Sequence, residues 1–170
     1  IGGSNTVSIT VGVRTGTLTE AASYDIPSLH TLNAPTDQYI NSATTGGLQI
    51  TVTGGDFGMF DSSYQARIGG SATEMTAWMS ETTILCKYSL GVGRTLTVSV
   101  TGGIQVGTLT EAASYDIPSL VSIDLGNSPT TGGVLTSIRG ADFGLFDSSP
   151  GARLGGSACE ATEWVSEIRV

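Results

Sequence analysis

Charged residues are scarce in this 170-residue chain, where they make up 13% of the sequence and only seven of them are Lys or Arg. Those seven are scattered singly, so the sequence has no basic patch of the kind that binds the phosphates of nucleic acid. The formal net charge of −8 indicates a solvated acidic surface instead. We therefore expect no nucleic-acid partner.

Histidine and long apolar runs are also lacking. His30 is the only histidine, so no histidine-based triad or metal site can recur along the chain, and we interpret it as a linker residue. No window holds 18 consecutive apolar residues, which argues against a membrane span. The opening residues have no basic region typical of a signal peptide, so we expect a processed chain or a piece of a longer one.

The chain does contain an internal repeat. Residues 16–29 recur unchanged at 107–120, an offset of 91. Residues 44–81 align with 130–167 at an offset of 86, with 23 of 38 positions identical. The difference of five lies between residues 30–43 and 121–129, which we interpret as loops because loops tolerate changes of length.

The repeat predicts three parts. Residues 1–26 are the back half of one unit, residues 27–117 are a complete unit, and residues 118–170 are the front half of another. Val170 aligns with Ile84, and Ile1 aligns with Val92. In the repeat, the last residue of the chain therefore falls shortly before the first. We therefore expect the chain to be a building block whose copies follow one another head to tail.

Alternation of apolar and hydroxyl-bearing residues predicts strands at 48–53 and 95–101, and two further strands are expected at 82–88 and 109–115. Gly-rich turn signals separate them, at 45–47, 54–56, 69–71, 91–93 and 101–103. Short strands with such spacing favour an all-β antiparallel sandwich. No helix of three turns is expected.

Three motifs then suggest a family. Thr-Thr-Gly-Gly at 130–133, Gly-Ala-Asp-Phe-Gly at 140–144 and Leu-Gly-Gly at 154–156 recur in similar form at 44–47, 54–58 and 68–70. The chain resembles the IPT/TIG immunoglobulin-like domain over essentially its whole length. The resemblance implies tandem TIG β-sandwiches, one complete and two complementary halves, as in multi-TIG surface proteins of microbes and algae.

Several residues invite a chemical interpretation. Asp56 with Asp61, and Asp142 with Asp147, could form a calcium loop, but two carboxylates are few against six to eight oxygens, and turn-forming Asp is favoured. No catalytic constellation accompanies them. We therefore expect no enzyme activity, no metal and no cofactor.

The two cysteines occupy different positions of the repeat. Cys159 aligns with Thr73, whereas Cys86 aligns with a position beyond Val170. They therefore belong to different units, so we expect no disulfide within the chain, and we interpret Cys86 as a small buried hydrophobic residue.

Aromatic residues recur at fixed positions of the repeat, which favours a place in the core over sugar-stacking platforms. The pairs are Trp78 and Trp164, Phe57 and Phe143, and Phe60 and Phe146. O-linked glycans on the Ser/Thr-rich strand faces are a further expectation, the alternative being a plain hydroxyl-rich surface.

A half sandwich leaves a sheet edge and an apolar face open to water. We hypothesise that residues 1–26 of one chain complete residues 118–170 of the next, the alternative being that the halves join covalently in a longer polypeptide. The expected donor residues are Val7, Ile9, Val11, Leu18 and Tyr24, and the expected acceptor residues are Val134, Ile138, Leu154, Trp164 and Val170. Either way the chain is expected to be its own partner in an extracellular or cell-surface filament, with an adhesive or carbohydrate-binding TIG array as the alternative function.

Overall fold

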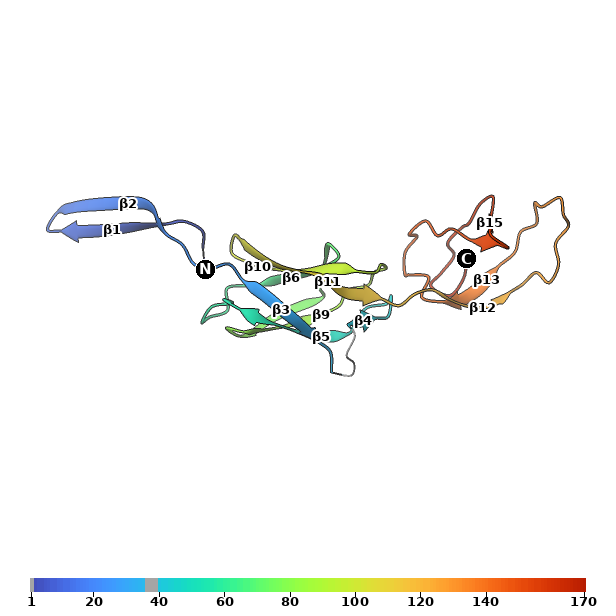
Figure 1. Ribbon diagram of the computed structural model, residues 1–170, viewed down its shortest axis with the longest axis horizontal. Helices are drawn as coiled ribbons and strands as arrows, with labels where there is room; N and C mark the ends of the chain where they lie inside the picture. The colour runs from blue at the N-terminus through green and yellow to red at the C-terminus, as the bar shows by residue number, and fades with distance from the viewer. Residues whose placement is uncertain (1, 36–39) are drawn as a thin grey trace.

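The structure, a computed structural model, describes residues 2–35 and 40–170 and is built of strands and loops. Three parts follow one another along the long axis (Figure 1). We call them the hairpin, the sandwich and the C-terminal segment. The hairpin consists of β1 (Asn5–Val11) and β2 (Arg14–Ala22). The sandwich contains β3 (Ser28–Asn33), β4 (Asn41–Ser42), β5 (Gln49–Gly55), β6 (Gln65–Ile68), β7 (Ser71–Ala72), β8 (Met75–Ser80), β9 (Thr83–Lys87), β10 (Leu96–Gly102) and β11 (Gln105–Tyr115).

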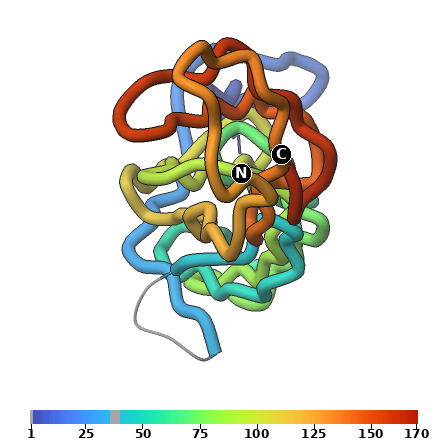
Figure 2. Tube along the Cα trace, turned by 90° about the vertical axis from the view of Figure 1, so that its right-hand side faces the viewer, coloured from blue at the N-terminus to red at the C-terminus, as the bar shows by residue number. Residues whose placement is uncertain are grey.

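The C-terminal segment contains four strands. They are β12 (Ser119–Ile123), β13 (Ile138–Ala141), β14 (Arg153–Leu154) and β15 (Ser157–Ala158). Figure 2, viewed from this end of the molecule, shows the loops of the segment in front of the sandwich. The described residues form no helix that is long and apolar enough to cross a membrane. The predicted all-β class is confirmed.

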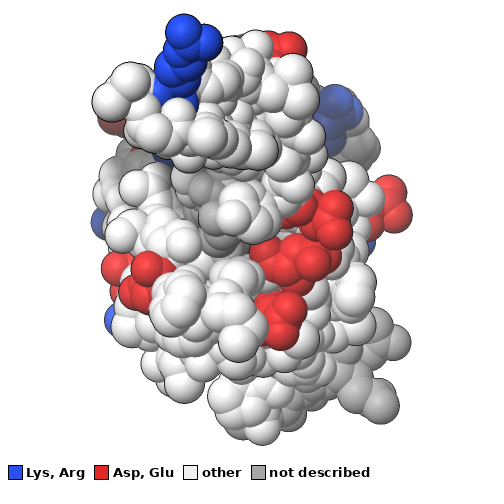
Figure 3. Space-filling view, turned by 90° about the vertical axis from the view of Figure 1, so that its left-hand side faces the viewer, with Lys and Arg blue, Asp and Glu red and all other residues white. Residues whose placement is uncertain are grey.

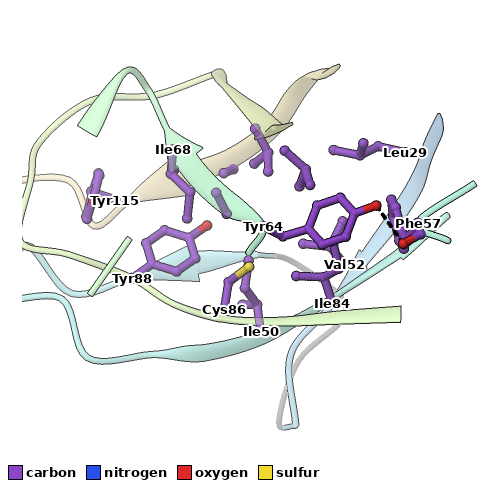
Figure 4. Packing of buried hydrophobic residues seen from close by; sticks show 14 residues of the cluster. Leu29, Ile50, Val52, Phe57, Tyr64, Ile68, Ile84, Cys86, Tyr88 and Tyr115 are labelled. Atoms are coloured by element: carbon purple, nitrogen blue, oxygen red, sulfur yellow. Dashed lines mark hydrogen bonds between the residues drawn. The ribbon is translucent and has the colours of Figure 1, made fainter. Parts of the chain in front are cut away.

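Two sheets face each other in the sandwich. One has the strand order β4-β11-β10-β6-β7 and the other the order β3-β5-β9-β8. Alternation along the strands directs one set of side chains inward, such as Ile50 and Val52 from β5 and Val98 and Val100 from β10, all at most 1% exposed. Figure 4 shows Ile50 and Val52 among the side chains packed between the sheets.

Two of the core tyrosines donate hydrogen bonds to nearby backbone, whereas the buried Tyr88 hydroxyl has no partner among the described residues. The Tyr64 hydroxyl donates to the Phe57 carbonyl at 2.5 Å, and the Tyr115 hydroxyl donates to the Ser89 carbonyl at 2.8 Å (Figure 4 draws the first). Burial raises the pKa of the Cys86 thiol to about 12, so it stays protonated at neutral pH. Burial, and to a smaller extent the neighbouring Tyr115, also raises the pKa of Tyr88.

One expected turn begins later in the chain than the sequence suggests. The sequence suggests a turn at 54–56, but Gly54 and Gly55 lie within β5, and the turn begins at Asp56, whose φ is 61°. A Cβ at Gly54 would lie 1.9 Å from the Ser28 carbonyl oxygen. Glycine is therefore required because β3 and β5 approach each other closely.

The segment 30–43 is only partly a loop. His30 lies on β3 with an exposed side chain, so its interpretation as a linker residue is wrong. β3 continues to Asn33 and β4 occupies Asn41–Ser42, while residues 36–39 fall outside the described residues. The pairing of β3 with β5 carries the strand beyond the repeat boundary, which periodicity alone does not reveal.

The pairings of the sandwich recur outside it, residue for residue. Val7↔Leu18 in the hairpin corresponds to Val98↔Leu109 between β10 and β11, and both pairs of strands carry the same irregularity one step earlier. The pairing of β12 with β13 repeats that of β3 with β5, and β14 with β15 repeats β6 with β7. The repeated sequence therefore folds into the same strand pairs each time.

Leu29 and Leu120 occupy equivalent positions and offer a matched test of this fold. Leu29 is 8% exposed and Leu120 is 70% exposed. Leu29→Ala is expected to lower the free energy of unfolding by about 2–5 kcal/mol, because it leaves a cavity in the core. In dilute protein Leu120→Ala should change it by less than about 0.5 kcal/mol. Urea unfolding followed by circular dichroism measures both, and equal effects would contradict the assignment of the core.

Candidate functional site: an exposed hairpin and an open half-sandwich

The hairpin presents a core-type face to solvent. Val7 is 46% exposed and Ile9 is 67% exposed, whereas their equivalents Val98 and Val100 are fully buried. All five predicted donor residues are exposed: Val7, Ile9, Val11, Leu18 and Tyr24. In Figure 1 the hairpin extends beyond the sandwich, at the end opposite the C-terminal segment. Its apolar face is therefore uncovered by the described residues.

Charge does not mark this end of the molecule as a site. Figure 3 shows acidic side chains distributed over the face at the hairpin end, few basic ones, and a surface that is mostly uncharged. An interaction here would depend mainly on apolar contact and backbone pairing rather than on charge.

The C-terminal segment has an open sheet edge. In the sandwich, β6 pairs with β7 on one side and with β10 on the other, where Val98 lies opposite Ile68 and Val100 opposite Ala66. Its equivalent β14 pairs with β15 alone among the described strands. The backbone edge that β10 occupies in the sandwich is therefore free at β14.

An open cavity of about 460 Å³ lies between the C-terminal segment and the end of the sandwich. Its lining includes equivalents of sandwich core residues: Leu120 (for Leu29), Ile138 (for Val52), Phe143 (for Phe57), Ala152 (for Ala66) and Val170 (for Ile84). In the sandwich these residues pack in one core with Val98 and Val100 of β10. The cavity is thus lined by side chains whose equivalents belong to the core of the sandwich.

The predicted acceptor residues divide into two groups. Ile138 and Val170 line the cavity, while Val134 and Leu154 are exposed outside its lining. Trp164 is half-buried, and its indole N–H donates to the Gly144 carbonyl at 3.1 Å. Sequence reasoning missed Leu120, although it ends a block that recurs unchanged and its equivalent, Leu29, is buried.

Gly16 has no structural explanation within a single chain. A Cβ at its equivalent, Gly107, would lie 2.2 Å from the Pro27 carbonyl oxygen, so glycine is required in the sandwich. A Cβ at Gly16 would meet nothing within 4 Å. The residue equivalent to Pro27 at the other end of the chain is Pro118.

A second pair of positions changes size in a compensating way. In the sandwich, a Cβ at Gly102 would lie 2.4 Å from the Tyr64 ring. The equivalents are Val11 in the hairpin and Pro150 in the cavity lining. The side chain is larger where its facing residue is smaller, as is expected of two surfaces that pack together.

The recurring aromatic residues are only partly in the core. Phe57 and Phe143 are buried, as expected. Phe60 is 80% exposed and Phe146 is also exposed, so the core interpretation of that pair is wrong. Both follow the Asp-Phe-Gly turn, which directs the earlier Phe inward and leaves the later one in solvent.

Two of the four aspartates, Asp61 and Asp147, cap turns, while Asp142 accepts a hydrogen bond from the Thr44 hydroxyl at 3.4 Å. The Asp61 carboxylate accepts the Ser63 backbone N–H at 2.8 Å, and Asp147 accepts that of Ser149 at 2.7 Å, which confirms the turn interpretation of both. Within residues 2–35 and 40–170, no three His, Cys, Asp or Glu side chains are grouped to hold a metal ion. Cys86 is buried, Cys159 is exposed and both are free thiols.

Comparisons with known proteins place one part of this chain in a family. The family model described as the IPT/TIG domain matches residues 38–115. No curated protein matches the sequence. The solved structures include the plexin A4 full extracellular region, domains 1 to 10, at 19% identity and a TM-score of 0.44, covering 84% of this chain and 12% of that one.

A second plexin A4 structure, with domains 1 to 8, gives 13% identity and the same TM-score of 0.44, covering 68% of this chain and 12% of that one. This chain therefore spans only a small part of those proteins. Residues 38–115 form an IPT/TIG domain.

Proposed function

We propose that the chain is the subunit of a filament that assembles by sharing strands. Residues 1–26 of one copy complete residues 118–170 of the next, as β10 and β11 complete the sandwich formed by residues 27–117. The observation that carries this proposal is the shared register. The hairpin reproduces β10 and β11 pair for pair, yet exposes the face that those strands bury.

The register specifies the intermolecular pairing. Val98↔Ile68, Ser99↔Arg67 and Val100↔Ala66 in the sandwich translate to Val7↔Leu154, Ser8↔Arg153 and Ile9↔Ala152 between copies. β1 then adds to the free edge of β14, which is recognition by strand addition. Val7, Ile9, Leu18 and Tyr24 face the cavity in the same step.

Assembly in this way is open-ended. The hairpin and the C-terminal segment lie at opposite ends of the chain, with the sandwich between them (Figure 1). One copy cannot fill its own half-sandwich, and the two contact surfaces differ. A contact of this kind does not close on itself and produces a linear polymer.

The apolar contacts favour association, and their gross contribution is of the same order as its cost. Burial of a large apolar side chain contributes about 1.5–3 kcal/mol, so the five donor side chains contribute about 8–15 kcal/mol before costs. Loss of translational and rotational freedom opposes this by about 4–15 kcal/mol. The β1–β14 backbone hydrogen bonds and the burial of the cavity lining add to the favourable side.

We place the filament outside the cell or on its surface. Two features support this location: the hydroxyl-rich strands and the match to the IPT/TIG domain, which resembles the repeated units of surface proteins. O-linked glycans on those strands belong to the same proposal. The role is structural and requires no catalytic residue.

An adhesive or carbohydrate-binding array is the second candidate. The exposed Phe60 and Phe146, at equivalent positions after the same turn, favour it because exposed rings can stack on sugars. Binding of the chain to a glycan array, lost in Phe60→Ala, is the expected result under this candidate. Absence of binding to any glycan would remove it and leave the filament proposal intact.

Gly16→Ala separates assembly from folding. In the free chain the added methyl group has open space, so the urea midpoint of dilute protein should not fall. In the docked hairpin the methyl would meet the Pro118 carbonyl, so polymerisation should fail or its critical concentration should rise at least about 30-fold, as for overpacking that costs about 2 kcal/mol or more. Light scattering and electron microscopy measure this.

Two controls complete this experiment. Thr17→Ala changes a neighbouring residue of β2 whose equivalent, Thr108, is exposed in the sandwich, and it should polymerise normally. A chain without residues 1–26 should not polymerise at all. Normal fibres from the Gly16→Ala chain or from the shortened chain would refute strand sharing.

A further inference from the structure

The tip of the β10–β11 hairpin contacts the chain that precedes the sandwich. The Gln105 side-chain amide donates to the Tyr24 carbonyl at 2.7 Å. Ile104, beside it, extends toward Gly3, where an ideal Cβ would lie 2.8 Å from the Ile104 Cδ1 atom. The β10–β11 hairpin therefore makes two kinds of contact. It pairs within the sheets of the sandwich, and its tip contacts the residues that precede the sandwich.

The repeat identifies the same positions at the next joint along a filament. Val11 pairs with Arg14 at the tip of β1–β2, as Gly102 pairs with Gln105 at the tip of β10–β11. Arg14 therefore stands in the place of Gln105, and Val13 in the place of Ile104. The residues they would face are Tyr115, equivalent to Tyr24, and Arg94, equivalent to Gly3.

The residues that the incoming tip would contact lie at the open cavity. Arg94, Tyr115 and Asp116 line the same open cavity as the half-sandwich core. The segment that joins the two units is also the same at both joints, because residues 107–120 repeat residues 16–29 without change. The incoming tip thus meets a linker of identical sequence.

We propose that Arg14 of the incoming copy donates to the main-chain carbonyl of Tyr115 in the receiving copy, while Val13 packs against Arg94. This contact rests on the proposed strand sharing and adds a second attachment to it. One incoming hairpin then binds the half-sandwich and the complete sandwich of the receiving copy at once, and so fixes the angle between consecutive units.

Hydrogen-bond chemistry permits the exchange of glutamine for arginine. Gln105 uses only its N–H donor in this contact, and its Oε1 atom is buried with no partner among the described residues. A guanidinium has donors only, so arginine makes the same bond without burying an acceptor. Asp116, next to Tyr115, lines the same cavity and accepts a hydrogen bond from the Asn41 side-chain amide, so it adds negative charge on the side from which the guanidinium approaches.

The sizes at the neighbouring position also agree. Gly3 has no Cβ, and the Cδ1 methyl of Ile104 lies where a Cβ would crowd it. At the next joint Arg94 carries a Cβ, and Val13 lacks a δ-methyl group. The loss of the δ-methyl group relieves the crowding at the Cβ position, and the rest of the long Arg94 side chain extends beyond that position.

Variants of Arg14 in the full-length chain test this contact. Arg14→Ala should still form filaments, since the strand pairing is intact, but with a critical concentration about 5- to 20-fold higher, because a hydrogen bond to a charged donor is lost. Its filaments should also bend more, with a shorter persistence length in electron micrographs. Arg14→Gln restores the residue type of position 105 and should behave like the unmodified chain.

The outcomes distinguish this contact from strand sharing itself. Arg14 is exposed in the free chain, so the urea midpoint of dilute Arg14→Ala should equal that of the unmodified chain. Arg14→Ala filaments with unchanged critical concentration and persistence length would overturn the joint contact alone. An unmodified chain that forms no filaments would overturn strand sharing, and the joint contact with it.

Discussion

A strand in a β-sandwich needs a partner for its backbone and a facing sheet for its apolar side. In residues 28–115 both needs are met: β10 lies between β11 and β6, and Val98 and Val100 are buried between the sheets. The same sequence pattern in β1 has β2 alone as a partner, and Val7 and Ile9 face solvent. At the C-terminal segment the open cavity has a lining of core-type residues but no strand among the described residues that covers it. Within the described part of the chain, the hairpin therefore lacks a facing sheet, and the C-terminal segment lacks a strand pair like the one that the hairpin provides.

Compensating changes link the two ends more closely than similarity of repeats does. Gly102 and Tyr64 become Val11 and Pro150, while Gly3 and Ile104 become Arg94 and Val13. In each exchange one side gains volume where its facing residue loses it. Under the proposed strand sharing, the hairpin and the cavity are halves of one core that lie in separate chains.

Much of this fold follows from periodicity and from the repeat. The strands at 48–53 and 95–101 lie within a residue or two of their expected places, because alternation reports a half-buried strand directly. Position within a sheet is harder to read: Gly54 lies in a strand because Ser28 approaches it, a contact between distant segments. Phe60 shows another limit, since a repeated residue can be repeatedly exposed. The interest of Leu120 and Gly16 follows only from the burial of their equivalents, Leu29 and Gly107, in the sandwich.

Cross-linking at the proposed β1–β14 register tests strand sharing most directly. Ser8 and Arg153 correspond to Ser99 and Arg67, which lie opposite each other in the sandwich. With Cys159 replaced by serine, Ser8→Cys with Arg153→Cys should give disulfide-linked ladders at multiples of the chain mass, which collapse on reduction. Thr10→Cys with Arg153→Cys, two residues out of register, should give few. Ladders of equal yield from both pairs, or none from the first, would contradict the account.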